Sequence, residues 1–137
     1  YNSPENEFVG QFIGSPAMNL LPGRIVDIGT QTTVSLNDDC VAVSNIGTSS
    51  TDIGKQVNVG VRPEHLRLTE GVHLLKAEVE ITEALGEYTL LYVKHALQDE
   101  NLIAKIPGTH KSLRNQLVKF SADPSKVHLF HNGLSMR

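Results

Sequence analysis

The sequence is poor in several residue types on which common protein functions depend. Its 137 residues include one cysteine, Cys40, no tryptophan, four phenylalanines and three tyrosines. A single cysteine excludes an intrachain disulfide and a cysteine-rich metal site, fits a reducing compartment, and is expected to serve as a small, partly buried apolar group. The formal charge of −3 and the few aromatic rings disfavour nucleic acid as a partner, because such domains need basic surfaces and stacking platforms.

Long hydrophobic runs are absent as well. No apolar run approaches the roughly 18 to 20 residues that span a bilayer, and the first residues are polar instead of a basic region followed by an apolar one. We therefore expect a soluble chain. A length of 137 residues predicts one compact domain, either undivided or built of two lobes. Because the sequence begins at Tyr1 without a methionine, we interpret it as a fragment or a processed product.

A short helix is expected near the beginning of the chain. Ser3-Pro4-Glu5-Asn6-Glu7 has the composition of a helix start, with a capping serine, a proline suited to the first turn and acidic residues at the positive dipole end. The apolar residues that follow share one helical face: Phe8, Val9, Phe12 and Ile13. Gly14 can end the helix. So short a helix needs its apolar face covered, by an upstream domain or by this domain's own sheet.

From Leu20 onward, short apolar segments are separated by Gly, Asn, Asp and Pro, which is typical of β-strands joined by turns. The clearest is Val57, Val59 and Val61, which alternate with more polar residues until Pro63 ends the strand. We predict strands over residues 24–28, 32–36, 40–43, 57–61, 76–82, 88–93, 102–106, 116–120 and 127–130. The fold class is therefore mainly β, with an OB-like small barrel or a pair of such barrels after one short N-terminal helix.

The second half of the chain repeats the strand-and-turn style of the first, but we found no sequence repeat clear enough to establish a duplication. Between the early strands, residues 45–55 are rich in Ser, Thr and Gly. This segment is the best candidate for a mobile loop, and the alternative is a plain solvated connection.

The motifs that carry catalysis are not found. Gly54-Lys55 suggests a phosphate-binding loop, but Gln56 stands where the hydroxyl residue belongs and Ser49 replaces the first glycine, so we interpret it as a turn. Glu78 and Glu80 share a strand face that is better explained as a solvated surface than as an acid/base pair. We expect no catalytic residue in this chain.

Six histidines raise the question of a metal site. Four are scattered among expected loops and strand ends without ligand spacing: His65, His73, His95 and His110. Only His128 and His131 lie close in sequence, and strand residues three apart point to opposite faces unless the strand ends between them. We expect surface or strand-edge histidines and no metal site.

One charged corner stands out at Arg62-Pro63-Glu64-His65, where proline fixes the backbone as the strand ends. Arg62 and Glu64 are thereby held in a defined relation, and two explanations stay open. Their charges face a partner, or the corner is structural, with Arg62 paired to a nearby carboxylate and Glu64 capping a short turn.

Several short motifs occur in order along nearly the whole chain. They are residues 1–6 (YNSPEN), 8–9 (FV), 12–19 (FIGSPAMN), 59–66 (VGVRPEHL), 83–86 (EALG), 123–124 (DP) and 128–130 (HLF). Together they resemble the C-terminal regulatory domain, the transport-associated OB-like domain, of the ATP-binding subunit of maltose- and glycerol-phosphate-type sugar ABC importers.

The resemblance implies a division of the chain and a function. Residues 1–19 would be a helix and linker from a preceding nucleotide-binding domain, and residues 20–137 an OB-like β regulatory domain. ATP, Mg²⁺ and the catalytic residues would belong to that preceding domain, so the fragment is no enzyme and holds no cofactor while the parent is an ATPase. Implied partners are a second ATPase subunit, permease subunits reached through the preceding domain, and in some members a regulatory protein. The implied location is the cytoplasm, peripheral at the membrane.

Two segments are the expected places for partner contacts. These contact residues are Arg62, Glu64, His65, Glu83, Gly86 and Glu87. The alternative function is a small oxyanion- or ligand-binding β module, for which the four hydroxyls of Thr48-Ser49-Ser50-Thr51 are the candidate site, although the sequence shows no cation beside them. The transported sugar is not encoded in these residues.

Overall fold

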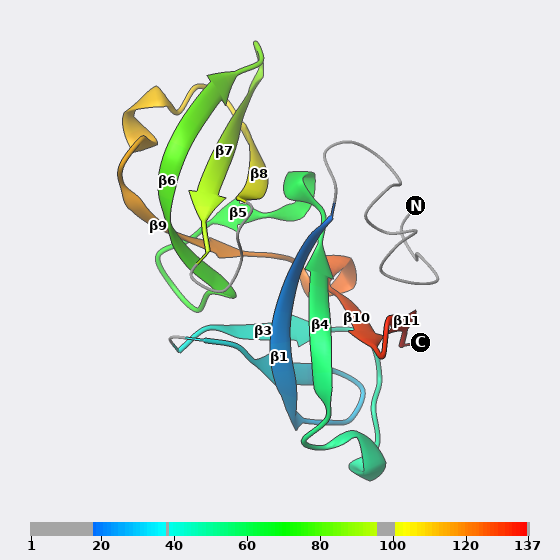
Figure 1. The fold of residues 1–137 in the computed structure, drawn as a ribbon. Helices are drawn as coiled ribbons and strands as arrows, with labels where there is room; N and C mark the ends of the chain where they lie inside the picture. Colours follow the sequence, from blue (N-terminus) through cyan, green and yellow to red (C-terminus); the bar gives the residue numbers. More distant parts are fainter. Residues whose placement is uncertain (1–17, 38, 96–100, 137) are drawn as a thin grey trace.

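The computed structural model describes residues 18–37, 39–95 and 101–136, and within them the chain forms two antiparallel sheets (Figure 1). The first sheet has the order β11-β10-β4-β1-β2-β3 and the second the order β5-β9-β6-β7-β8. The strands are β1 (Asn19–Asp27), β2 (Thr32–Ser35), β3 (Val41–Ser44), β4 (Gln56–Val61), β5 (Arg67–Leu68), β6 (Leu75–Ala84), β7 (Tyr88–Lys94), β8 (Leu102–Pro107), β9 (Leu117–Ser121), β10 (His128–His131) and β11 (Leu134–Ser135). The described helices are four short 3₁₀ turns: η1 (Ser50–Asp52), η2 (Pro63–His65), η3 (Lys111–Leu113) and η4 (Pro124–Lys126).

The mainly β fold class is confirmed, and each of the nine predicted strands overlaps an observed one. Two short strands, β5 and β11, were not predicted, because two residues are too few to show alternation. β1 begins at Asn19, earlier than the predicted start at residue 24. The prediction stopped short because Pro22, a residue that disfavours strands, lies inside β1. Up to Gly23 this strand pairs with β4 alone, so its other edge needs no backbone donor there and tolerates a proline. The predicted helix and most of the linker in residues 1–19 lie outside the described residues, and that division stays a prediction.

The two halves of the chain fold as repeats with the same succession of elements. Repeat 1 runs from β1 through η1 and η2 to β5, and repeat 2 runs from β6 through η3 and η4 to β10. Their registers correspond, because Leu21 pairs with Val59 as Leu75 pairs with Phe120. Each first strand also has an irregularity at the same place, between Ile25 and Asp27 and between Val79 and Ile81.

Turn hydrogen bonds correspond as well. Ile25 N donates to Lys55 O at 3.0 Å, and Val79 N donates to Gln116 O at 2.9 Å. The residue before each acceptor lies in the left-handed region, with φ of 81° at Gly54 and 68° at Asn115. The structure thus reveals a repeat that the sequence hides, since few equivalent residues are identical: for example Leu21 and Leu75, Val57 and Val118, and Pro63 and Pro124.

Each repeat gives its last strand to the sheet of the other. β5 of repeat 1 pairs with β9, with Arg67 opposite Ser121, and β10 of repeat 2 pairs with β4, with His128 opposite Gly60. The exchange is reciprocal, so neither sheet is complete without both halves of the chain. One hydrophobic core accordingly includes residues of both repeats, among them Val59, Leu91 and Phe120.

Side chains and backbone bonds reinforce this junction. Asn19 is buried at the start of β1 and joins it to β8, because its Nδ2 donates to Ile103 O at 2.8 Å and its Oδ1 accepts from Ile103 N at 2.8 Å. Elsewhere in repeat 1, Ser44 Oγ donates to Val127 O at 2.7 Å and Asn45 N donates to Pro124 O at 3.0 Å, both acceptors belonging to repeat 2. Both ends of the junction are therefore tied by buried polar groups whose loss would leave unpaired partners.

Gly60 is required by the exchanged strand. A Cβ at this position in β4 would lie 2.6 Å from Met18 Sδ and 2.8 Å from Phe130 Cε2. The glycine therefore allows β10 to approach β4 closely enough to pair with it. No helix among the described residues is long and apolar enough to cross a membrane.

Candidate functional site

The proline corner, residues 62–65, lies where β4 ends and η2 begins. Pro63 occupies the first turn of η2 after an extended Arg62 (φ −72°, ψ 149°), and His65 N donates to Arg62 O at 2.9 Å. η2 packs against β8 of the other repeat. The corner is thus part of the junction between the repeats.

The two charges of the corner have different surroundings. Arg62 is 1% exposed and is the largest of the fully buried side chains, whereas Glu64 is exposed. Burial lowers the pKa of the Arg62 guanidinium, because the charged form loses hydration. Arg62 therefore serves the interior of the corner, and Glu64 is its surface-facing charge.

Basic groups from both repeats surround this corner. Burial, then the charges of Arg62, His65 and Lys126, lowers the pKa of His128 to about 4. Burial also lowers the pKa of His65, against an opposing effect of Glu64. His65 Nδ1 is buried and finds no hydrogen-bond partner among the described residues. At neutral pH the arrangement holds neutral histidines beside a buried guanidinium.

No group of three or more His, Cys, Asp or Glu side chains among the described residues is placed to hold a metal ion. His131 Nδ1 lies 3.0 Å from Gln56 O, and Asn132 Nδ2 lies 3.4 Å from His131 Nε2. His128 instead packs near the Phe130 ring, with 6.5 Å between centroids. The two histidines thus have separate local roles in β10.

The hairpin tip, residues 83–88, is exposed at the far end of β6 and β7 (Figure 1). Leu85 N donates to Tyr88 O at 2.7 Å, and Gly86 has a φ of 76°, which favours glycine. Glu87 O accepts from Gly108 N at 2.7 Å, which ties the tip to the end of β8. The structure therefore places Glu83, Gly86 and Glu87 together in the hairpin between β6 and β7, whereas Arg62, Glu64 and His65 lie in the separate corner between β4 and β5.

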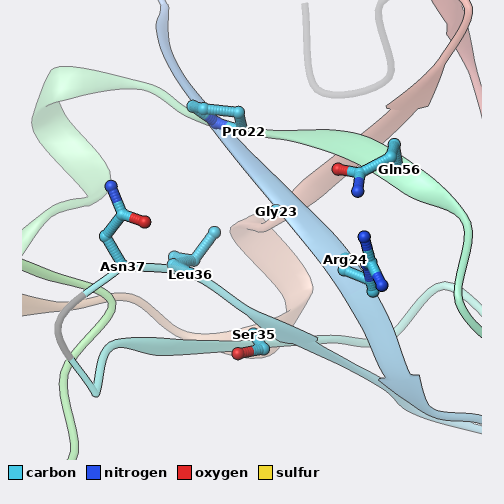
Figure 2. A pocket seen from close by; sticks show the side chains of 7 residues that line it. All are labelled: Pro22, Gly23, Arg24, Ser35, Leu36, Asn37 and Gln56. Atoms are coloured by element: carbon cyan, nitrogen blue, oxygen red, sulfur yellow. The ribbon is translucent and has the colours of Figure 1, made fainter. Parts of the chain in front are cut away.

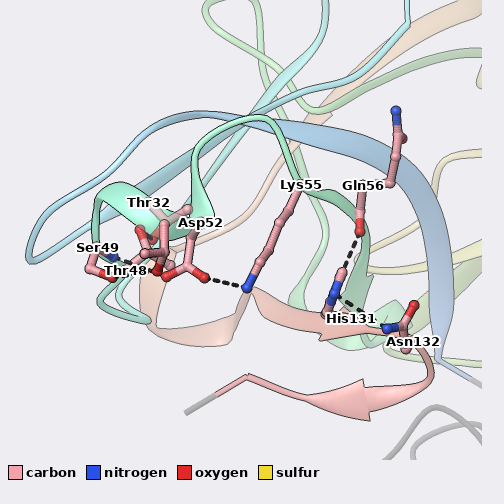
Figure 3. A network of polar contacts seen from close by, with 9 residues as sticks. Thr32, Thr48, Ser49, Asp52, Lys55, Gln56, His131 and Asn132 are labelled. Carbon is pink, nitrogen blue, oxygen red and sulfur yellow. Dashed lines mark hydrogen bonds and ion pairs between the residues drawn. The ribbon is translucent and has the colours of Figure 1, made fainter.

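The loop of residues 45–55 is held by several hydrogen bonds, which favours the plain connection over the mobile loop (Figure 3). Thr48 and Gly29 exchange backbone bonds of 2.9 and 3.2 Å, and Thr32 Oγ1 donates to Ile46 O at 2.6 Å. Asp52 accepts from Ser49 N at 3.0 Å and from Lys55 Nζ at 2.7 Å. The Gly54-Lys55 turn is confirmed, with Gly54 at a φ of 81°.

The hydroxyl cluster of this loop does have a cation nearby, which was not apparent from the sequence. Lys55 reaches Asp52, and that carboxylate separates the ammonium group from Ser49. Because Asp52 already neutralises Lys55, the cluster carries no uncompensated positive charge for an oxyanion.

A shallow polar groove crosses the first sheet beside Gly23 (Figure 2). In the amide orientation that suits its neighbours, Gln56 donates to Gly23 O at 3.2 Å and accepts from Arg24 Nη2 at 2.8 Å. These polar groups therefore bind one another across β1 and β4. The lining of the groove is Pro22, Gly23, Arg24, Ser35, Leu36, Asn37 and Gln56.

The outward-pointing tyrosines of β7 are a surface feature that was not predicted from the sequence. β7 alternates the buried Thr89, Leu91 and Val93 with Tyr88 and Tyr92, which point outward and are partly exposed. Both faces of this strand carry apolar or aromatic residues. The alternation of apolar and polar residues that distinguishes a buried face from an exposed one is therefore missing from its sequence. The spacing of the tyrosines at every fourth residue was the available signal.

Comparisons with known proteins cover nearly the whole chain. The model of the MalK OB fold domain matches residues 14–66, and that of the TOBE domain matches residues 59–130. The two matches overlap at the proline corner, where the first sheet leads into the second. They confirm the OB-like fold class.

Similar proteins are ATP-binding proteins of importers. The alpha-glucoside transport ATP-binding protein AglK of Rhizobium meliloti is 46% identical over 139 residues, which cover 100% of this chain and 38% of that protein. The maltose/maltodextrin import ATP-binding protein MalK of Vibrio vulnificus is 32% identical, with coverages of 96% and 36%. The sn-glycerol-3-phosphate import ATP-binding protein UgpC of Psychromonas ingrahamii is 34% identical, with coverages of 95% and 34%. The chain thus spans little more than a third of the length of these relatives.

A solved structure of the cytoplasmic molybdate-binding protein ModG is similar with a TM-score of 0.61 and 14% identity, over 82% of this chain and 95% of that one. At this identity the likeness concerns the fold alone.

Proposed function

Because the chain belongs to the family of MalK OB fold and TOBE domains that occur in the ATP-binding subunits of sugar ABC importers, we propose that it is the regulatory and dimerising domain of such a subunit. The observation that carries this proposal is the match from end to end with importer ATP-binding proteins. At 46% identity to the alpha-glucoside protein over all of this chain, the proposed cargo of the parent is a carbohydrate.

The geometry supports a role in holding proteins together. Strand exchange joins the repeats through two sheets and a shared core, which suits a body that keeps its shape while attached domains move. Its proposed contact points, Glu64 and the exposed hairpin tip, lie on separate elements, the corner after β4 and the turn between β6 and β7. Such a body can engage two neighbours at once.

The parent is proposed to hydrolyse ATP in a preceding nucleotide-binding domain, with Mg²⁺ bound there, and to pair with a second ATPase subunit. Permease subunits bound to that preceding domain would hold it at the cytoplasmic side of the membrane. A regulatory protein is proposed to bind at Glu64 or at the hairpin tip. The 137-residue chain alone should neither bind nor hydrolyse ATP.

The decisive test is the coding sequence immediately before Tyr1, together with uptake by the parent. We expect a Walker A loop and an ABC signature upstream, and loss of labelled-sugar uptake when residues 20–137 are deleted while the permease subunits persist. A start codon directly before Tyr1, or ATP turnover by the purified 137-residue chain, would contradict the proposal.

A second function, a small oxyanion-binding module, has one observation in its favour: Lys55 lies near the hydroxyls of residues 48–51. The carboxylate of Asp52 weighs against it, because it already accepts from Lys55 at 2.7 Å. Calorimetry with molybdate, sulfate and phosphate separates the two functions. Three flat titrations remove the oxyanion module, and saturable binding that Lys55→Ala abolishes would establish it.

A further inference from the structure

The second sheet has a notch at the point where the chain leaves β9 after β5. Thr69 N donates to Lys119 O at 3.0 Å, and Gly71 N then donates to Thr69 Oγ1 at 3.1 Å, so the chain turns away from β9. The space that remains, the β9 notch, is a pocket of about 150 Å³. An apolar cavity of about this volume takes up one benzene ring. The lining of the notch is mainly apolar, with Leu68, Leu113, Leu117 and Val118.

A backbone carbonyl points toward this notch. Gln116 O accepts from Val79 N of β6 at 2.9 Å, whereas Lys119 O accepts from Thr69 N on the opposite edge of β9. Because carbonyls two residues apart in a strand point to the same edge, Leu117 O is directed to the same side as Lys119 O. No hydrogen bond to Leu117 O comes from the described part of the chain. The notch therefore combines an unused acceptor with apolar walls, as small-ligand sites do.

Repeat 1 shows what occupies the equivalent position. Gln56 corresponds to Leu117, because each follows the acceptor of the equivalent turn bond, Lys55 or Gln116. The carbonyl of Gln56 lies 3.0 Å from His131 Nδ1 (Figure 3). Since a carbonyl can only accept, the imidazole donates to it through Nδ1–H. Repeat 1 thus closes its own notch with an imidazole ring from the exchanged strand β10.

Repeat 2 lacks this ring, because Glu70 stands where repeat 1 has His131. Each of the two follows the last residue that pairs with the neighbouring strand, Thr69 in repeat 2 and Phe130 in repeat 1. An ionised carboxylate only accepts hydrogen bonds, so the side chain of Glu70 cannot donate to Leu117 O. The same backbone therefore holds a filled position in one repeat and an unfilled one in the other.

The charges of the lining favour a neutral occupant. Glu70 and Lys119 are the charged residues of the notch, and they have opposite signs. A charged ligand would be repelled by one of them and would lose hydration against the apolar walls. A neutral ring that carries one N–H donor avoids both costs and still satisfies Leu117 O.

We propose that the β9 notch binds a neutral imidazole-type ring, whose N–H donates to Leu117 O as His131 donates to Gln56 O. The apolar walls cover the faces of the ring and provide most of the attraction. This chemistry has two sources, a free small molecule and the histidine side chain of an extended segment of another protein, and the test separates them. The inference uses neither sugar import nor subunit pairing, so it is independent of the proposed function.

Nuclear magnetic resonance titration of the isotope-labelled 137-residue chain tests the site. The probe is 4-methylimidazole, at a pH well above the pKa of its ring. We expect saturable shifts at residues 69–70 and 117–119, with a Kd on the order of 1 mM for so small a ligand. Residues 56–58 should not respond, because His131 already fills their notch. 1-Methylimidazole has the same size but no N–H and should bind about tenfold more weakly. Equal binding of the two compounds would overturn the hydrogen bond to Leu117 O.

A substitution supplies repeat 2 with a ring of its own. Glu70→His should fill the notch from within and weaken binding of 4-methylimidazole by about tenfold, because a tethered ring competes at high effective concentration. Glu87→His adds a histidine at the exposed hairpin tip, and this matched control should leave binding unchanged. Undiminished binding to Glu70→His would show that the ring lies elsewhere and would overturn the proposal.

The source of the ring is identified with N-acetylhistidine methylamide, in which backbone amides flank the imidazole. If it binds at least about threefold more tightly than 4-methylimidazole, the ring comes from a partner's extended segment, since the amides can also pair with the strand edge at Leu117. Equal or weaker binding assigns the notch to a free ring. Absence of saturable shifts with both compounds overturns the proposal. None of these results alters the upstream coding sequence or sugar uptake, so failure of this site is distinct from failure of the proposed function.

Discussion

The two repeats share a backbone and differ in what they expose. In repeat 1 the outer row is Asp27, Thr33 and Val43, and in repeat 2 it is Ile81, Tyr92 and Ile103, although the strand irregularity beside it is the same. Interior positions stay apolar in both, such as Ile25 and Val79, at 1% and 0% exposed. The alternation of buried apolar residues and the hydrogen bonds of the turns therefore maintain the fold in both repeats. The outer surface of one repeat can change, and acquire a binding role, without loss of the fold.

The largest expected effect tests whether the repeats are separable at all. Phe120 is fully buried in β9, and Phe120→Ala should lower the free energy of unfolding by about 4 kcal/mol. Because each sheet contains a strand of the other repeat, the loss should reach both. Urea unfolding followed by tyrosine fluorescence, which reports mainly repeat 2, and by circular dichroism should show one coincident transition. Two separated transitions would mean that the repeats are independent.

A second substitution tests whether β4 and β9, which occupy equivalent places in the two repeats, are packed with different tightness. Gly60 in β4 corresponds to Ser121 in β9, and only Gly60 is pressed against Met18 and Phe130. We expect Gly60→Ala to lower the free energy of unfolding by about 2–3 kcal/mol through overpacking of β10, and Ser121→Ala by about 0.5 kcal/mol or less. Chemical denaturation measures both. Equal effects would show that β10 does not approach β4 as described.

The polar ties at the junction allow a similar comparison. Asn19→Ala removes the acceptor of Ile103 N and should lower the free energy of unfolding by about 2 kcal/mol, because a buried donor loses its partner. His73 occupies the equivalent position of repeat 2, where its Nδ1 lies 3.0 Å from Gly71 O of the same loop and its Nε2 has no hydrogen-bond partner among the described residues. His73→Ala should therefore cost about 0.5 kcal/mol or less. Hydrogen exchange at Ile103 supplies the local readout, and unchanged protection in Asn19→Ala would contradict the tie.

The smallest effect concerns pH. The pKa of His128 is lowered to about 4 in the folded state, so between that pH and its ordinary value of about 6.5 the unfolded chain binds the proton more readily. The free energy of unfolding should therefore fall as the pH falls through this window, by about 1–2 kcal/mol from this residue after a reduction for solvent screening of a partly exposed group. His128→Gln should flatten that part of the profile, whereas Arg67→Gln, at the equivalent position of repeat 1, should not. A profile unchanged by His128→Gln would contradict the shift.

The sequence contained enough to predict the strands but not their exchange. Alternation at Val57, Val59 and Val61 and the stop at Pro63 predicted β4 and the corner correctly, because local periodicity and a proline act within a few residues. Pairing of β10 with β4 depends on residues about 70 positions apart and leaves no local pattern. The repeat was hidden for a related reason, since its equivalent positions keep their size and burial but not their identity.

The candidate site was predicted in part. The hairpin tip at Glu83, Gly86 and Glu87 lies at the surface as partner contact would need, and the contact itself stays a prediction. Arg62 was expected either to face a partner or to serve a structural corner, and its burial favours the structural role. That outcome depends on the packing of η2 against β8, a contact between repeats that the eight-residue motif around Pro63 does not encode.

The exchange of β10 also determines the order in which the two sheets can be completed during translation. During translation the first four strands emerge early, but the sheet that they begin also needs β10 (His128–His131) and β11 (Leu134–Ser135). β4 therefore keeps one edge unpaired until β10 has been made, whereas the second sheet, whose last strand in the sequence is β9 (Leu117–Ser121), can recruit β5 and close first. The half of the protein that is made first is thus the half that finishes folding last.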